Sequence, residues 1–140
     1  MSYRFSCTQS VRWKDIDAAG VLNNAVYLTF LEQARLLYFR DLELCRGDQF
    51  PFLLGETCIR YHAPARAGEE LLVRARSSRL GNKSFEMVYE ICRGPEALAT
   101  AVATLVWVDE NLRSIPIPED ARLRIAEFEG IEPSGGPLEG

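Results

Sequence analysis

The segment from Asn23 to about Leu42 constrains the fold more than any other part of the chain, because it contains neither Gly nor Pro and is apolar on most sides. Asn23 is suited to cap a helix, and the spacing predicts one continuous helix over this segment. The apolar residues leave only a narrow polar stripe around Thr29, Glu32, Gln33 and Arg40. A helix that is apolar on most faces must be buried on several sides. The rest of the chain is therefore expected to wrap around it.

Strand patterns account for most of the remaining sequence. In residues 3–13 the alternation puts one set of apolar side chains on a single face: Tyr3, Phe5, Cys7, Val11 and Trp13. Four further strands are predicted over residues 57–62, 71–80, 84–93 and 97–108. Turn residues at 81–82 and 94–95 separate the last three, which should therefore pair antiparallel. Residues 97–108 are almost continuously apolar, as expected of a strand that is central or covered on both faces.

One long helix with antiparallel strands places the chain in the α+β class. Its 140 residues suffice for one packed domain but not comfortably for two, so residues 1–130 are predicted to form a single domain. Residues 119–129 have the pattern of a short second helix. Residues 131–140 are rich in Pro, Gly and Ser and are predicted to be a flexible tail.

The composition excludes several classes of function. The net charge is −4 and the basic residues are dispersed, which argues against nucleic-acid binding. No apolar run reaches membrane-spanning length and no leader precedes the first strand, so a cytoplasmic protein without a membrane segment is expected. The four cysteines are far apart and there is one histidine, so free thiols and no metal or redox cofactor are predicted.

Residues 15–28 join a loop with two acidic residues to the start of the apolar helix. The first N–H groups of a helix have no intrahelical partners, and the helix dipole is positive there. Such a helix start can hold a developing oxyanion. Asp17 would lie beside it, so this junction can form an active site.

The segment from Asp15 to Leu28 resembles the signature of the 4-hydroxybenzoyl-CoA thioesterase family, whose members have the hot-dog fold. Residues 60–69 resemble a second landmark of that family, in which a strand ends at a Pro turn. The resemblance implies a curved antiparallel sheet wrapped around one long central helix. It also implies that Asp17 is the catalytic aspartate and that the backbone N–H of Asn24 polarises the thioester carbonyl.

Each of these residues has an alternative role. Asp17 can simply form a turn, because Asp often accepts hydrogen bonds from backbone N–H groups before a helix. Asp15 is expected to support the loop and is a second candidate acid. Glu32 is a reserve acid, because some hot-dog thioesterases use a carboxylate on the helix. His62 is expected to be structural or exposed, since the motif of a hydratase is absent.

Further residues are candidates for substrate binding. Asn23 and Tyr27 are expected to cap and pack the helix, and both are placed to line the pocket, as is Glu32. Coenzyme A carries phosphates, so cationic side chains near strand ends, among them Arg60 and Lys83, are candidates to bind it. The resemblance implies a tunnel between subunits, and hence a homodimer or homotetramer.

The resulting hypothesis is an acyl-CoA thioesterase that hydrolyses a thioester to a free acid and CoA, with Asp17 as nucleophile or general base. CoA is part of the substrate, and no cofactor is expected. Two alternatives remain open. The chain could be a non-catalytic module that binds acyl-CoA or acyl carrier protein, or it could be an acyl-carrier-protein thioesterase.

Overall fold

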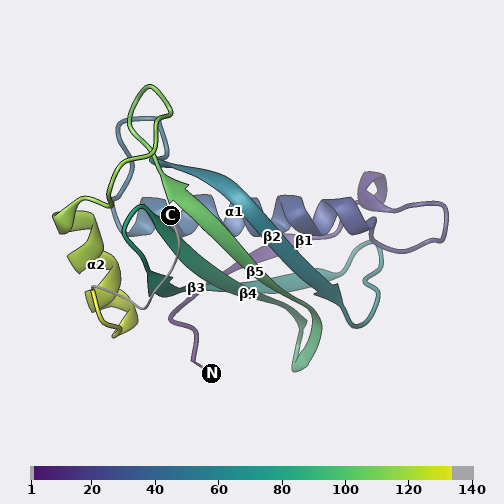
Figure 1. Cartoon of the computed structure of the whole chain (residues 1–140). Coiled ribbons are helices and arrows are strands. Elements are labelled where there is room, and N and C mark those ends of the chain that lie inside the picture. Colours follow the sequence, from purple (N-terminus) through teal and green to yellow (C-terminus); the bar gives the residue numbers. More distant parts are fainter. Residues whose placement is uncertain (1, 134–140) are drawn as a thin grey trace.

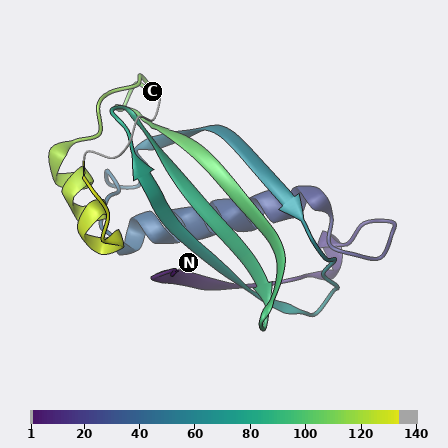
Figure 2. The same cartoon turned by 60° about the horizontal axis from the view of Figure 1, so that its bottom comes forward.

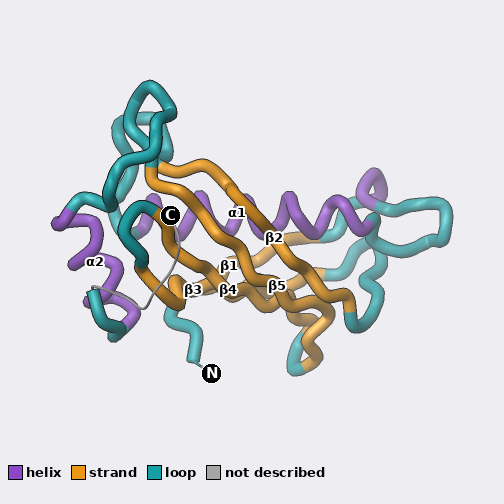
Figure 3. The backbone as a smooth tube through the Cα atoms, in the orientation of Figure 1, coloured by secondary structure: helices purple, strands orange, loops and turns teal. Residues whose placement is uncertain are grey.

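The computed structural model describes residues 2–133, which form one sheet, two α-helices and a short 3₁₀ turn (Figures 1 and 3). In chain order the elements are β1 (Phe5–Ser10), the 3₁₀ turn (Trp13–Asp15), α1 (Asn24–Asp41), β2 (Phe52–Tyr61), β3 (Glu70–Leu80), β4 (Ser84–Arg93), β5 (Glu96–Trp107) and α2 (Glu119–Glu129). The two helices lie close to their predicted positions. Residues 134–140 of the predicted tail fall outside the described residues.

The strands form a single antiparallel sheet in the order β1-β3-β4-β5-β2. It curves over α1, which lies across its inner face (Figure 2). This confirms the predicted α+β arrangement, and β5 is an internal strand as expected. β2 begins at Phe52 rather than at residue 57, and its pairing with β5 is shifted between Leu54 and Glu56. Gly55 lies at this irregularity and weakens the strand pattern, so the sequence did not indicate the first half of β2.

The core lies between α1 and the inner face of the sheet. The buried residues of the helix are Tyr27, Phe30, Leu31, Ala34, Arg35, Tyr38 and Phe39. The ring of Phe39 lies 4.6 Å from that of Phe52, 5.6 Å from that of Phe85 and 5.9 Å from that of Trp107. The side of α1 that faces away from the sheet is open in the single chain, where Glu32 is exposed. The sheet therefore buries one side of the helix, and the expected burial on several sides is not reached within one chain.

The prediction for residues 3–13 is wrong at its end. β1 stops at Ser10, and Trp13 lies in the 3₁₀ turn with 84% of its surface exposed. The turn forms because the carboxylate of Asp15 accepts hydrogen bonds from the backbone and side chain of Arg12. This local capping interaction overrides the alternating pattern at Trp13.

Helix α2 packs against the sheet near the C-terminal end of α1 (Figure 1). Oε2 of Glu129 accepts hydrogen bonds from the Tyr38 hydroxyl at 2.6 Å and from the Ser77 N–H at 2.8 Å. Burial raises the pKa of Glu129 and, with the carboxylate nearby, that of Tyr38. These bonds join α2 to both α1 and β3.

Two predictions from composition can be compared with the described residues. Cys7, Cys45, Cys58 and Cys92 are all free, as expected, although Cys58 is exposed. Neither α1 nor α2 is long and apolar enough to cross a membrane.

Candidate active site

The loop before α1 is anchored by Asp15, which is only 4% exposed. Its carboxylate accepts hydrogen bonds from the Arg12 backbone N at 2.9 Å and from Nε and Nη2 of the same residue at 3.1 and 3.0 Å. Hydrogen bonds from the Arg12 guanidinium lower the pKa of Asp15. Its backbone carbonyl accepts the N–H of Asn23. Asp15 therefore supports the loop, as expected.

Asp17 is half-buried in the same loop and forms a turn. Its Oδ1 accepts the N–H of Ala19 at 2.8 Å, and its carbonyl accepts the N–H of Gly20 at 3.0 Å. Gly20 has a φ of 83°, which favours glycine. Within residues 2–133, no donor is bonded to the second carboxylate oxygen, Oδ2. The turn and catalytic roles are thus compatible, because one oxygen holds the turn and the other remains available.

The start of α1 leaves one N–H group free. Oδ1 of the cap residue Asn23 accepts the N–H of Ala25 at 2.9 Å, and its carbonyl accepts that of Val26 at 2.9 Å. The N–H of Asn24, the first residue of the helix, has no acceptor in the described part of the chain. This is the backbone donor that the sequence resemblance indicated, and it lies where the helix dipole is most positive.

A cavity of about 220 Å³ lies beside this helix start. It is lined by Val21, Leu22, Asn24, Tyr27, Tyr61, His62, Ala63 and Pro64. The Tyr61 hydroxyl donates to the Asn24 carbonyl at 2.9 Å, and the Tyr61 ring lies edge-on to Tyr27 at 5.0 Å. Burial raises the pKa of Tyr27. The end of β2 is thereby fixed against the first turn of α1.

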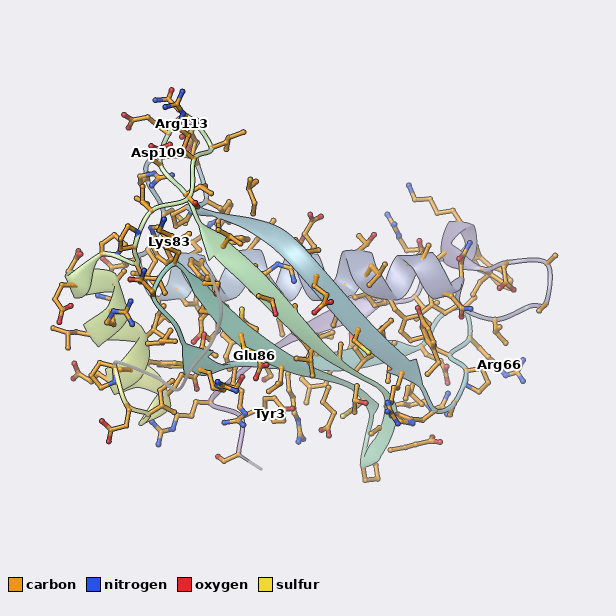
Figure 4. The ribbon with its side chains drawn as sticks, viewed as in Figure 1. Tyr3, Arg66, Lys83, Glu86, Asp109 and Arg113 are labelled. Atoms are coloured by element: carbon orange, nitrogen blue, oxygen red, sulfur yellow. The ribbon has the colours of Figure 1, made fainter. Side chains whose placement is uncertain are left out.

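Asp17 is not among the residues that line this cavity, and neither are Asn23, Glu32, Arg60 and Lys83. Asn23 caps the helix and Glu32 is on its exposed side. Arg60 lines a separate cavity of about 440 Å³ together with Thr100 and Val102 of β5. Lys83 lies between β3 and β4, at the opposite end of the sheet from Arg66 (Figure 4). The loops at the start of α1 gather at the Arg66 end (Figures 3 and 4), so one chain does not bring Lys83 to Asp17.

Sequence reasoning did not assign Tyr61 to the site and placed His62 elsewhere. Both belong to the landmark of residues 60–69, which was the available signal. The Tyr61 hydroxyl donates to the Asn24 carbonyl, whereas Nε2 of His62 lies 3.0 Å from the Thr100 hydroxyl. Among the described residues, no three His, Cys, Asp or Glu side chains come together as metal ligands would.

The fold and the helix start together correspond to the class of hot-dog thioesterases. A thioesterase from Thermus thermophilus, solved with coenzyme A and zinc, has a similar structure with a TM-score of 0.84. The two sequences are 31% identical, and the match covers 93% of this chain and 98% of the other.

The chain belongs to the Thioesterase-like superfamily, whose profile matches residues 11–125. It is 27% identical over 124 residues to the acyl-CoA thioesterase YbgC of Haemophilus influenzae, a match that covers 84% of this chain and 91% of that protein. It is 26% identical over 125 residues to the chloroplastic acyl-acyl carrier protein thioesterase ATL3 of Arabidopsis thaliana. That match covers 84% of this chain but only 65% of the plant protein. These relatives place the chain in a class of thioester hydrolases.

Proposed function

We propose that the chain hydrolyses acyl-CoA thioesters at the start of α1. The observation that carries this proposal is the N–H of Asn24. Asn24 is one of the residues that line the cavity of about 220 Å³, and its N–H is the one of the first three helical N–H groups that has no acceptor within residues 2–133. A thioester carbonyl placed there accepts this hydrogen bond, and the bond strengthens as negative charge develops on the oxygen.

Asp17 supplies the second requirement of the reaction. Its free Oδ2 either attacks the thioester carbonyl carbon or removes a proton from the water that attacks it. In the first route the C–S bond breaks, the CoA thiolate leaves, and water then cleaves the acyl–aspartyl anhydride. In the second route the acid forms directly. In a single turnover in isotope-labelled water, label that enters Asp17 demonstrates the first route, because water has then attacked the aspartyl carbonyl of the anhydride.

The remaining candidate residues have roles in binding. Asn23 fixes the helix start and Tyr27 forms a wall of the cavity, while Glu32 is the reserve acid. Arg60 and Lys83 are the proposed contacts for the phosphates of CoA. Because Lys83 lies at the far end of its own sheet, its contact would come from the partner subunit of a homodimer or homotetramer. The exposed Leu28 on α1 and Leu53 on the edge strand β2 are consistent with such an interface.

One alternative substrate and one alternative function remain. The Arabidopsis relative is named for acyl carrier protein thioesters, so the acyl group of this chain's substrate could be presented by that carrier. The net charge of −4 disfavours docking of an acidic carrier protein unless a basic patch is present. A binding module without hydrolysis would leave the free Oδ2 of Asp17 without a role.

The test is free-thiol release from a panel of aliphatic and aromatic acyl-CoAs by the native chain and by Asp17→Asn. The asparagine retains an oxygen that can accept the Ala19 N–H, so the turn should persist while the charge is lost. Asp48→Asn, in the exposed loop after α1, is the matched control. Loss of turnover in Asp17→Asn alone supports the proposal. Equal turnover in all three proteins would transfer the role to Glu32, and binding without thiol release would favour the binding module.

A further inference from the structure

Arg35 is a buried cation that has no ion pair among residues 2–133. It is 4% exposed, on the face of α1 that packs against the sheet. Its Nη1 donates to the Tyr89 hydroxyl at 2.8 Å, and its guanidinium lies 5.8 Å from the centre of the Tyr89 ring. Its Nε is buried and has no hydrogen-bond partner. A buried charge without a counter-ion is costly, so this group is poised to bind an anion.

Arg35 lines a cavity of about 230 Å³ between α1 and β2. The helix contributes Leu28, Leu31 and Arg35, which share one face, and β2 contributes residues 54–57 at its pairing irregularity. The Thr57 hydroxyl oxygen in this wall is also buried and without a partner. Arg35 and Thr57 therefore line the same cavity, and each carries a buried polar atom that has no partner.

This second cavity lies farther along α1 than the cavity at the helix start, and residues of α1 and β2 line both cavities. β2 runs antiparallel to α1, because Tyr61 bonds to Asn24 at one end and Phe52 packs on Phe39 at the other. Thr57 thus lies between the two ends. Arg35 is eleven residues beyond Asn24, or about 16 Å along the helix, and the side chains of a helix tilt back toward its start. An acyl chain that runs along α1 from Asn24 would therefore pass Leu28 and Leu31 before it reaches Arg35.

We propose that Arg35 and Thr57 bind a carboxylate at the far end of the acyl chain, so that the preferred substrates are thioesters of dicarboxylic acids. This proposal rests on the proposed hydrolysis at Asn24 and specifies its substrate class. The guanidinium edge formed by Nε and Nη2 matches the two oxygens of a carboxylate, and the Thr57 hydroxyl can donate to one of them. The leucines accommodate the methylene chain between the two ends.

Glu56 is the one acidic residue that lines this cavity. It is exposed and forms no ion pair with Arg35 in the described part of the chain. Its charge opposes entry of a carboxylate and does not neutralise the guanidinium. Glu56→Gln should therefore keep or increase the preference for a terminal carboxylate. If Glu56→Gln loses that preference, the proposal that Arg35 binds the terminal carboxylate of a substrate is wrong.

The experiment compares CoA thioesters of equal chain length that end in a carboxylate or in a methyl group, suberoyl-CoA against octanoyl-CoA. The native chain is expected to favour suberoyl-CoA in kcat/KM. Thr57→Val, which keeps the shape of the side chain, should reduce that preference about tenfold, and Arg35→Gln should reduce it further, about a hundredfold. Thr104→Val, on the neighbouring strand β5 and outside this cavity, is the matched control. Equal rates for the two substrates, or variants that slow both alike, would overturn the proposal and make Arg35 a packing residue of Tyr89.

A second measurement separates this proposal from the hydrolysis itself. The melting temperature of each protein is recorded with free suberate and with octanoate. Stabilisation of the native chain by suberate, lost in Thr57→Val, supports the anion site even if no CoA thioester is hydrolysed. If suberate stabilises neither the native chain nor the Thr104→Val control, the anion site is refuted, whatever the turnover.

Discussion

Asn24→Pro is the sharpest test of the proposed oxyanion donor, because it removes the one backbone N–H to which the role is assigned. Asn24 is the first residue of α1, the position at which proline is best tolerated in a helix. The preceding residue, Asn23, has φ −60° and ψ 131°, which is the conformation that a following proline favours. The cap from Asn23 to Ala25 and the bond from Tyr61 to the Asn24 carbonyl do not involve the lost hydrogen.

The two expected effects of this substitution differ greatly in size. The lost N–H has no acceptor within residues 2–133, so folding loses no hydrogen bond, and the stiffer unfolded chain should raise stability by about 0.4–1 kcal/mol. In the transition state the same N–H is worth about 3–4 kcal/mol, so kcat should fall by a hundredfold to a thousandfold. Asn24→Ala removes the side chain but keeps the N–H, and it should retain most of the activity.

The assay is thiol release with the best acyl-CoA substrate, measured beside the melting temperature of each variant. We expect a stable proline variant whose kcat is at least a hundredfold below that of the native chain, and an alanine variant that keeps most of the activity. A proline variant with kcat within about threefold of native, at an unchanged melting temperature, would refute the assignment of the donor. A proline variant that unfolds instead would show that the helix start lacks the geometry described here.

Two further predictions concern stability. Phe39→Ala empties the centre of the aromatic cluster and should lower the free energy of unfolding by about 3–5 kcal/mol. Urea unfolding measures this loss, and the m-value should not change. A loss below about 1 kcal/mol would contradict the packing of Phe39. Burial raises the pKa of Glu129 above its ordinary 4.5, so its contribution to stability is complete below 4.5 and is lost as the pH rises through the raised pKa. The melting temperature of the native chain minus that of Glu129→Gln should therefore decrease from acid to neutral pH. A difference that does not vary with pH would contradict the effect of burial on Glu129.

The helices were predictable because local chemistry determines them. Asn23 caps α1 as its side-chain type suggests, and α2 follows a proline and begins with acidic residues. The predicted strand boundaries are wrong where a capping interaction or a non-local pairing outweighs the local sequence pattern. Trp13 leaves the strand because Arg12 and Asp15 bind each other, and the first half of β2 is held by pairing with β5 across an irregularity at Gly55.

The candidate site divides in the same way. Asp17 and the Asn24 N–H lie within one short segment, so a motif can indicate both. Arg35 and Thr57 are on different elements, and their meeting depends on the path of β2 past α1. Nothing in the helix pattern distinguishes Arg35 from an exposed arginine at the edge of an apolar face. Only the folded chain shows that it is buried without a counter-ion.

The cavity at the helix start and the cavity at Arg35 should also respond differently to substitution. At Asn24 the chemistry belongs to the backbone, so any residue except proline supplies it, and a change of side chain should leave the rate of hydrolysis largely intact. At Arg35 and Thr57 the chemistry belongs to the side chains, so a change there should alter which acyl group is preferred. A hydrolase built in this way could change its substrate without losing its reaction, because the proposed oxyanion donor and the proposed acyl-chain anchor lie on the same helix about three turns apart.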